Sequence, residues 1–184
     1  MAPAMIDMLI DDDISVEISK SLPSAQQAET AVLAACVCAE FAVTEIDVCI
    51  RFASDTSQQA LNKQWRDQDK VTDVLSFPMQ QAPCDASEPL GDIALAVPFI
   101  LQEAARLDVP EHDHCLHLII HATLHLLSFD HIDDHDAKRM QALEQQAMQA
   151  LGLHNPYPEA IDNKQTDNKK TETEQMGNEE VEQS

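Results

Sequence analysis

The segment that follows Pro110 most constrains how this chain folds, because as a helix it separates two kinds of side chain. One side is an apolar stripe that needs a core to pack against. The stripe consists of Leu116, Ile119, Ile120, Thr123 and Leu127. The other side carries four histidines within about 80° of arc at 100° per residue. They are His114, His117, His121 and His125.

A metal centre is predicted from the spacing of His121, His125 and His131. Side chains four apart on a helix lie on the same face, and a turn folds the third histidine back toward them. Three imidazoles leave one coordination position open, as in catalytic zinc sites. Metallopeptidases share the spacing but carry a glutamate general base directly after the first histidine. Here that residue is Ala122, so we expect chemistry other than peptide hydrolysis.

The apolar pattern predicts a mixed α+β domain over residues 1–158, with about four strands and about five helices. Strands are expected at 5–10, 47–53, 71–77 and 92–97, and a loop at 80–89. Helices are expected at 24–41, after Ser54, at 98–107, after Pro110, and from Asp133 to Gly152. Residues 159–184 are polar and acidic, and predict a disordered tail.

Composition excludes several classes of protein. The chain has 33 acidic and 11 basic residues, a formal net charge of −22, so a nucleic acid would need a local basic patch. Three glycines are too few for a Walker loop or a dinucleotide fingerprint. An odd number of cysteines, five, without a signal peptide or membrane span, predicts reduced thiols, a cytoplasmic location and no membrane partner.

Three basic residues lie close together at Lys63, Arg66 and Lys70. On an anionic chain such a cluster is a candidate phosphate-binding patch, and a guanidinium grips phosphate with two hydrogen bonds. The alternative is a set of ion pairs with neighbouring acids, which composition alone would favour. Those acids are Asp67, Asp69 and Asp73.

Three sequence words resemble those of one bacterial family. Residues 61–78, LNKQWRDQDKVTDVLSFP, are similar to L-N-x-x-(aromatic)-R-x-x-D-x-x-T-(D/N)-V-L-S-F-P. Gly91-Asp92-Ile93 is similar to a G-D-I segment, and residues 121–131 are similar to H-G-x-L-H-L-x-G-Y-D-H. Order and separations agree, so the chain resembles the YbeY family over about residues 5–157.

The resemblance implies a zincin-like α+β fold and a single-strand-specific, metal-dependent endoribonuclease. It implies one Zn²⁺ per chain on His121, His125 and His131, and a need for Arg66 in activity. It also implies work in the cytoplasm on ribosomal RNA, at the 3′ end of the small-subunit RNA and in ribosome quality control. Expected partners are single-stranded or ribosomal RNA and the ribosome or its associated proteins. Lys63 and Lys70 are weaker candidates for substrate binding.

Several residue roles stay open at this point. His117 either supports a metal ligand or lies on a solvated helix edge, and Asp130 either orients an imidazole or is an ordinary turn residue. Three positions depart from the family words: Ala122, Ser128 and Phe129. Alanine suits a helix, whereas serine costs on the order of 1 kcal/mol if the turn requires a positive φ. Phenylalanine removes a phenol.

The expected chemistry is phosphodiester cleavage in which zinc activates a water molecule and Arg66 neutralises charge in the transition state. Whether metal hydroxide or the RNA 2′-hydroxyl attacks is open. Two other functions are also considered. One is a zinc-dependent peptidase or amidase of zincin type, and the other is a non-enzymatic ribosome-assembly factor with a structural metal.

Overall fold

The computed structural model describes residues 5–42 and 46–158 and confirms the α+β class. The strands are β1 (Met5–Ile10), β2 (Asp47–Ala53), β3 (Val74–Pro78) and β4 (Gly91–Ala96). The helices are α1 (Val16–Ser19), α2 (Ala25–Cys38), α3 (Asp55–Arg66), α4 (Val97–Leu107), α5 (Glu111–Leu126) and α6 (Asp134–Ala150). The expected tail at 159–184 lies outside the described residues.

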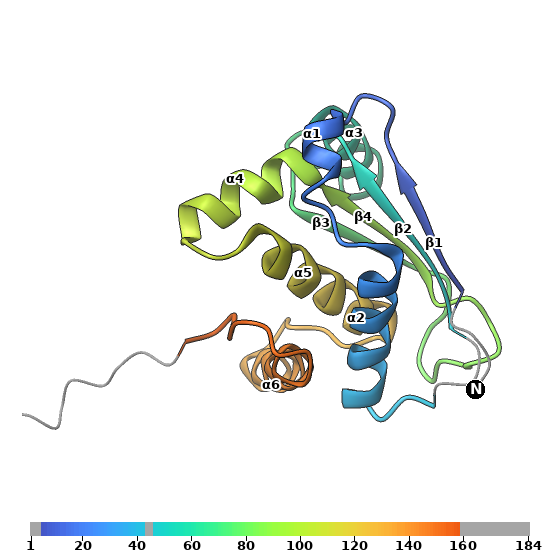
Figure 1. Cartoon of the computed structure of the whole chain (residues 1–184). Helices are drawn as coiled ribbons and strands as arrows, with labels where there is room; N and C mark the ends of the chain where they lie inside the picture. Colours follow the sequence, from blue (N-terminus) through green and yellow to red (C-terminus); the bar gives the residue numbers. More distant parts are fainter. Residues whose placement is uncertain (1–4, 43–45, 159–184) are drawn as a thin grey trace, which may run out of the picture.

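The four strands form one mixed sheet in the order β1-β2-β4-β3 (Figure 1). β1, β2 and β4 are parallel, and only β3 at one edge runs antiparallel to its neighbour β4. Along β2 the core side chains Val48, Ile50 and Phe52 alternate with the half-buried Cys49 and Arg51. This period of two means that only one face of β2 enters the main core.

Helices cover the two faces of the sheet unequally. α2 and α5 pack on the core face, and α6 packs against both of them on the side away from the sheet (Figure 1). α3 lies against β2 and β4 on the other face, where buried Gln58 donates a hydrogen bond of 3.0 Å to the carbonyl of Ala94. The remainder of that second face is open beside α3 and forms a groove described below.

The structure differs from the sequence expectations at a few boundaries. α1 was not expected, because a four-residue helix with no buried side chain has no detectable apolar period. α2 ends at Cys38 rather than at the expected residue 41. Two residues later, Glu40 adopts a left-handed conformation with φ of 56°, which stops the helix. β3 starts at Val74 rather than 71, since the Asp73 carboxylate accepts a 2.8 Å hydrogen bond from the Val74 N–H.

α5 is buried on more sides than its sequence pattern indicates. The expected stripe is buried, but Leu118, Ala122 and Leu126 are buried as well. The cause is its central position, because α5 contacts α2, α4, α6, β3 and β4. The histidine side of α5 therefore faces other parts of the protein.

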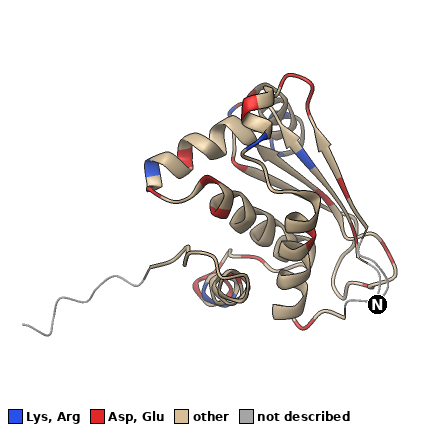
Figure 2. Ribbon diagram, in the orientation of Figure 1, with Lys and Arg blue, Asp and Glu red and all other residues tan. Residues whose placement is uncertain are grey.

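The distribution of charged residues and the state of the cysteines agree with what the composition predicts. Acidic side chains occur on most elements, whereas Lys and Arg are sparse (Figure 2). All five cysteines are free thiols, and burial raises the pKa of Cys36 and of Cys115 to about 12. Among the described residues, no helix combines the length and hydropathy that a membrane crossing requires.

Candidate metal centre

Three imidazoles converge at the C-terminal end of α5. His121 and His125 lie one turn apart on the helix, and His131 follows the turn after it. One ligand nitrogen of each lies within 4.8 Å of the others, and the Nε2 atoms of His121 and His125 are 3.1 Å apart. Nitrogens bound to one tetrahedral zinc at 2.0–2.1 Å are about 3.3 Å apart. The three histidines are therefore close enough together to share a single metal ion.

Hydrogen bonds at the far sides of the rings determine which nitrogens are free. Nδ1 of His121 is 2.8 Å from a Glu144 carboxylate oxygen, and Nδ1 of His125 is 2.9 Å from the Phe129 carbonyl oxygen. Both oxygens accept, so each Nδ1 carries a hydrogen and the neutral rings have lone pairs on Nε2. With both rings neutral, the two Nε2 lone pairs face each other at 3.1 Å and repel, and a cation bound by both would remove that repulsion.

Burial also disfavours a positive charge on His125. Burial lowers the pKa of His125 to about 4, with smaller contributions in the same direction from His121 and His131. A neutral ring at pH 7 is the form that donates a lone pair to a metal. The electrostatics of the pocket thus suit metal binding better than a cluster of protonated histidines.

Glu144 is the functional candidate that sequence reasoning missed. It lies on α6 and is 1% exposed, and its oxygens contact His121, His117 and Tyr157. Burial opposes its ionisation, but the hydrogen bonds from the two histidines outweigh burial and lower the pKa of Glu144 to about 2. A signal existed, because Glu144 occupies a position on the apolar face of α6 where a charged residue is unusual.

His117 belongs to this buried network rather than to a solvated edge. Its side chain is 13% exposed, and its Nε2 is 2.7 Å from the second Glu144 oxygen. His114, one turn earlier, is also buried and contacts Glu103 at 3.1 Å. Each histidine on this side of α5 therefore has a polar partner, and His117 and His121 share Glu144.

The turn after α5 brings His131 back toward the helix. At position 128, where the family has glycine, the backbone has a conformation that glycine adopts readily. Ser128 has φ of 68°, and the Phe129 N–H donates to the Leu124 carbonyl at 3.0 Å. Asp130 accepts a 2.7 Å hydrogen bond from the backbone N–H of His131. Its contact is thus with the backbone of the loop rather than with an imidazole.

Arg66 borders the histidine cluster. It lines a cavity of about 500 Å³ together with His125, Ser128 and Asp130. Among the described residues it forms no ion pair with an acidic side chain. Lys63 instead pairs with Asp69 at 2.8 Å on the exposed surface, as the ion-pair alternative expected, and neither Lys63 nor Lys70 lines the cavity.

A second groove of about 640 Å³ continues from Arg66 onto the open face of the sheet. It shares Arg66, Ser76 and Pro78 with the cavity at the histidines. Its apolar wall includes Trp65, which is 63% exposed and meets Phe77 edge to face at 5.9 Å. The two hollows therefore border each other across the edge strand β3.

A second group of potential ligands lies at the start of α6. It consists of Asp133, His135 and Asp136. Asp133 is the helix cap and accepts a 2.8 Å hydrogen bond from the Asp136 N–H. Capping accounts for this cluster without a metal.

Comparison with known proteins identifies the family. The model of the family described as endoribonuclease YbeY matches residues 12–152. Relatives named endoribonuclease YbeY include those of Rhizorhabdus wittichii, 45% identical over 60% of this chain and 70% of that protein, and Azorhizobium caulinodans, 38% identical over 83% and 95%. The relative from Chromohalobacter salexigens is 35% identical over 82% and 97%.

Among solved structures, the solution structure of TM1509 from Thermotoga maritima is similar, with 20% identity and a TM-score of 0.49 over 86% of this chain and 99% of that one. The family assignment depends on the sequence matches alone. Both the family model and the aligned relatives include α5, the turn after it and Arg66 within the matched core. The chain therefore belongs to the endoribonuclease YbeY family.

Proposed function

We propose that this chain is a zinc-dependent endoribonuclease that cleaves single-stranded RNA during ribosomal RNA maturation. Family membership supports the endoribonuclease activity and the role in RNA processing. The observation that carries the metal-dependent part is the convergence of three histidine nitrogens beside a cavity that Arg66 also lines. The 3′ end of the small-subunit RNA and ribosome quality control, taken from the family resemblance, are the proposed context in the cytoplasm.

His121, His125 and His131 are the proposed zinc ligands. Zinc on three histidines acts as a Lewis acid and lowers the pKa of water toward ~7. Arg66 is the proposed catalytic residue, because its guanidinium holds a phosphate with two hydrogen bonds and stays charged as negative charge develops there. Lys63 and Lys70, which lie outside the cavity, add only long-range attraction for the strand.

The groove on the open sheet face supports a single-stranded substrate. Exposed Trp65 offers a flat face on which an unpaired base stacks, and such stacking is worth ~1–3 kcal/mol per base. A strand that places a phosphate at Arg66 has its neighbouring nucleotide within the same groove. Paired bases are already stacked on each other and gain nothing from this wall.

The peptidase or amidase alternative is not favoured. A zincin-type peptidase needs a carboxylate after the first histidine, and this chain has the fully buried methyl group of Ala122 there. Glu144, which contacts Nδ1 of His121 at 2.8 Å, is buried and already holds three hydrogen bonds. Hydrolysis of casein by the zinc-loaded protein would reverse this preference.

The deciding experiment combines zinc analysis with cleavage of a single-stranded RNA. We expect wild type to bind one zinc and to cleave, His121→Ala to lose zinc and activity, and Arg66→Ala to keep zinc but lose most activity. Arg106→Ala is the matched control, because Arg106 pairs with Glu103 at the exposed end of α4. Circular dichroism of each variant separates a loss of chemistry from unfolding.

The outcomes also test the assembly-factor alternative. If His121→Ala unfolds and wild type with zinc does not cleave RNA, the metal has a structural role and the proposed activity is wrong. A folded but inactive His121→Ala, together with an inactive Arg66→Ala, supports catalysis at this site. Association with ribosomes is tested separately by co-sedimentation of the wild-type protein.

A further inference from the structure

Glu144 is a buried carboxylate that three hydrogen-bond donors approach. Its Oε1 atom is 2.8 Å from Nδ1 of His121. Its Oε2 atom is 2.7 Å from Nε2 of His117 and 2.5 Å from the hydroxyl of Tyr157. These donors come from α5 and from the segment after α6, so one side chain connects three parts of the fold around the candidate metal centre.

A buried carboxylate costs folding free energy, and this one has no Lys or Arg partner among the described residues. Replacing such a buried polar cluster as a whole by apolar side chains is often neutral or stabilising, so stability alone does not account for Glu144 and its donors. The contacts with two imidazoles and a phenol are instead those of a group that fixes an imidazole in one tautomer. The tautomer that Glu144 enforces leaves Nε2 of His121 free on the side where His125 and His131 lie.

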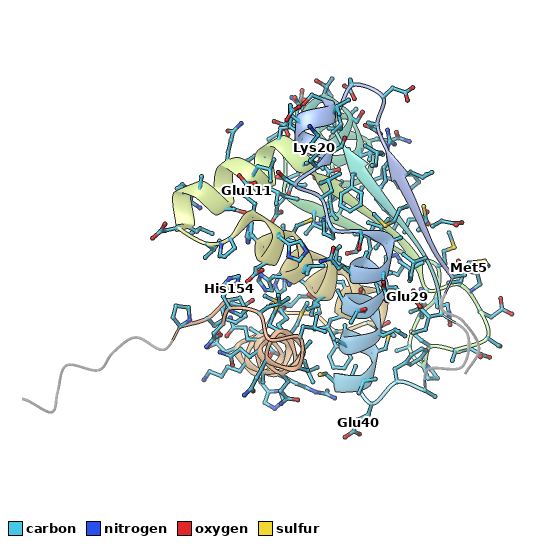
Figure 3. The ribbon with its side chains drawn as sticks, in the orientation of Figure 1. Met5, Lys20, Glu29, Glu40, Glu111 and His154 are labelled. Carbon is cyan, nitrogen blue, oxygen red and sulfur yellow. The ribbon has the colours of Figure 1, made fainter. Side chains whose placement is uncertain are left out.

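The segment after α6 restricts Glu144 in turn. Tyr157 packs edge to face on His117, with ring centroids 5.8 Å apart, while its hydroxyl donates to Glu144. The same segment returns to the start of α5, where His154, labelled in Figure 3, lies 3.4 Å from a carboxylate oxygen of Asp113. Tyr157 therefore reaches the carboxylate only while this segment is docked on α5.

We propose that Glu144 is a positioning residue for zinc, and that Tyr157 holds it in place. Glu144 accepts the Nδ1 hydrogen of His121 and so orients the Nε2 lone pair toward the ion. His117 occupies the second oxygen and prevents the carboxylate from rotating away. Docking of the segment that carries Tyr157 and binding of zinc at His121 favour each other. This inference rests on the proposed function, since it presumes that the three histidines bind zinc.

The test measures zinc affinity by competition with a chromogenic chelator, with no RNA present. Glu144→Gln keeps the shape but removes the negative charge, and we expect a loss of about 10-fold in zinc affinity. Glu144→Leu removes every acceptor, and the expected loss is about 100-fold. Tyr157→Phe deletes one donor to the carboxylate and leaves the carboxylate in place, so a measurable loss smaller than that of Glu144→Gln is expected.

Glu103→Gln is the matched control. Glu103 also pairs with a buried histidine of α5, His114, at 3.1 Å, but that histidine is not a candidate ligand. Its zinc affinity should equal that of wild type. A second readout is the Nδ1 and Nε2 nitrogen chemical shifts of His121 in the zinc-free protein, which should show the Nδ1–H tautomer in wild type and a mixture in Glu144→Leu.

Each result separates this inference from the proposed function. Weak zinc binding by wild type would overturn both. If wild type binds zinc and cleaves RNA while folded Glu144→Gln and Glu144→Leu bind zinc as tightly as wild type, only the role of Glu144 is wrong. If Glu144→Leu does not fold, Glu144→Gln and Tyr157→Phe decide, because both retain the volume of the native side chain.

Discussion

At the scale of single residues, the scarcity of glycine is visible at the ends of helices. Glu40, Asp67, Asp108 and Ser128 all have φ between 56° and 68°, and each directly follows or caps a helix. Glycine adopts this left-handed conformation without steric cost, whereas other residues have a Cβ atom that crowds the backbone. α6 differs from these helices, because the residue with positive φ that follows its cap is a glycine, Gly152, with φ of 69°.

Ser128 is the residue where this strain matters most, because the turn it forms delivers His131. We expect Ser128→Gly to raise the free energy of unfolding by about 1 kcal/mol, since the new residue accepts the positive φ without a Cβ clash. Urea denaturation of the zinc-free protein measures the difference. Ser128→Ala is the control, because it removes the hydroxyl and keeps Cβ, and it should give no gain. A gain in both variants would mean that the hydroxyl, not φ, is unfavourable.

Residue spacing was sufficient to predict that three histidines meet. Spacing was not sufficient to predict the contact between Glu144 and His121. These residues are 23 apart in sequence, and their contact depends on how α6 packs across α5. The tautomers of His121 and His125 were equally inaccessible, since each depends on an oxygen placed by tertiary structure. Their role as zinc ligands stays a prediction.

At the scale of elements, Asp11 joins β1 to two neighbours. Its carboxylate accepts a 2.7 Å hydrogen bond from Arg51 on β2 and a 3.2 Å hydrogen bond from the N–H of Ser54 at the cap of α3. Burial alone would raise the pKa of Asp11, but these hydrogen bonds outweigh burial and the pKa falls below its usual 3.8. The ionised form is therefore the one that the fold favours.

This arrangement predicts a pH-dependent contribution to stability. A carboxylate with a lowered folded-state pKa stabilises the fold above its unfolded-state pKa and loses that contribution as pH falls through the folded value. We expect Asp11→Asn to lower the free energy of unfolding by about 1 kcal/mol at pH 7. The difference from wild type should shrink only below pH 3.8.

Urea unfolding of both proteins between pH 7 and pH 2.5 gives this comparison. Asp12→Asn removes an adjacent exposed carboxylate and should change little at any pH in the range. A deficit in Asp11→Asn that persists unchanged at the acidic end would show that shape, rather than charge, makes the contribution of Asp11.

Most elements were predictable from sequence, and the exceptions have physical causes. Long segments with a clear period, such as those of α5, α6 and β2, bury one face and so carry a strong signal. α1 buries nothing and carries none. The burial of α5 on additional sides came from its central place among other elements, which no local pattern encodes.

At the scale of the whole molecule, a net charge of −22 repels the phosphates of an approaching RNA. Few cations offset it (Figure 2), and the one that lines the histidine cavity is Arg66. Each phosphate contact with single-stranded nucleic acid contributes about 0.7 to the slope of log affinity against log salt. An enzyme with few such contacts binds RNA weakly and with a shallow salt dependence.

We therefore expect zinc-free protein to bind a fluorescent single-stranded RNA with a slope of only about −1 to −2. Arg66→Ala should make the slope shallower by about 0.7, and Arg106→Ala should leave it unchanged. Fluorescence anisotropy over a salt series measures all three. A wild-type slope of about −5 or steeper would mean that a larger basic surface contacts the RNA.

Zinc should also stabilise the whole fold, because its proposed ligands lie on α5 and on the turn that joins α5 to α6. At a zinc concentration 100 times the dissociation constant, a ligand that binds only the folded state adds ~2.7 kcal/mol to the free energy of unfolding. Chelation should remove that increment, and His131→Ala should show little of it. Magnesium is the control ion, since it prefers oxygen ligands.

The hydrogen bond from Tyr157 to Glu144 has a practical consequence for anyone who shortens this protein. A version cut after Leu153 would retain the sheet, the six helices, the histidines of α5 and His131. It would nevertheless remove the aromatic cover of His117 and open Glu144 to solvent. Truncations and fusion tags should therefore begin beyond Pro158, because an apparently peripheral stretch of chain closes the wall behind the candidate metal centre.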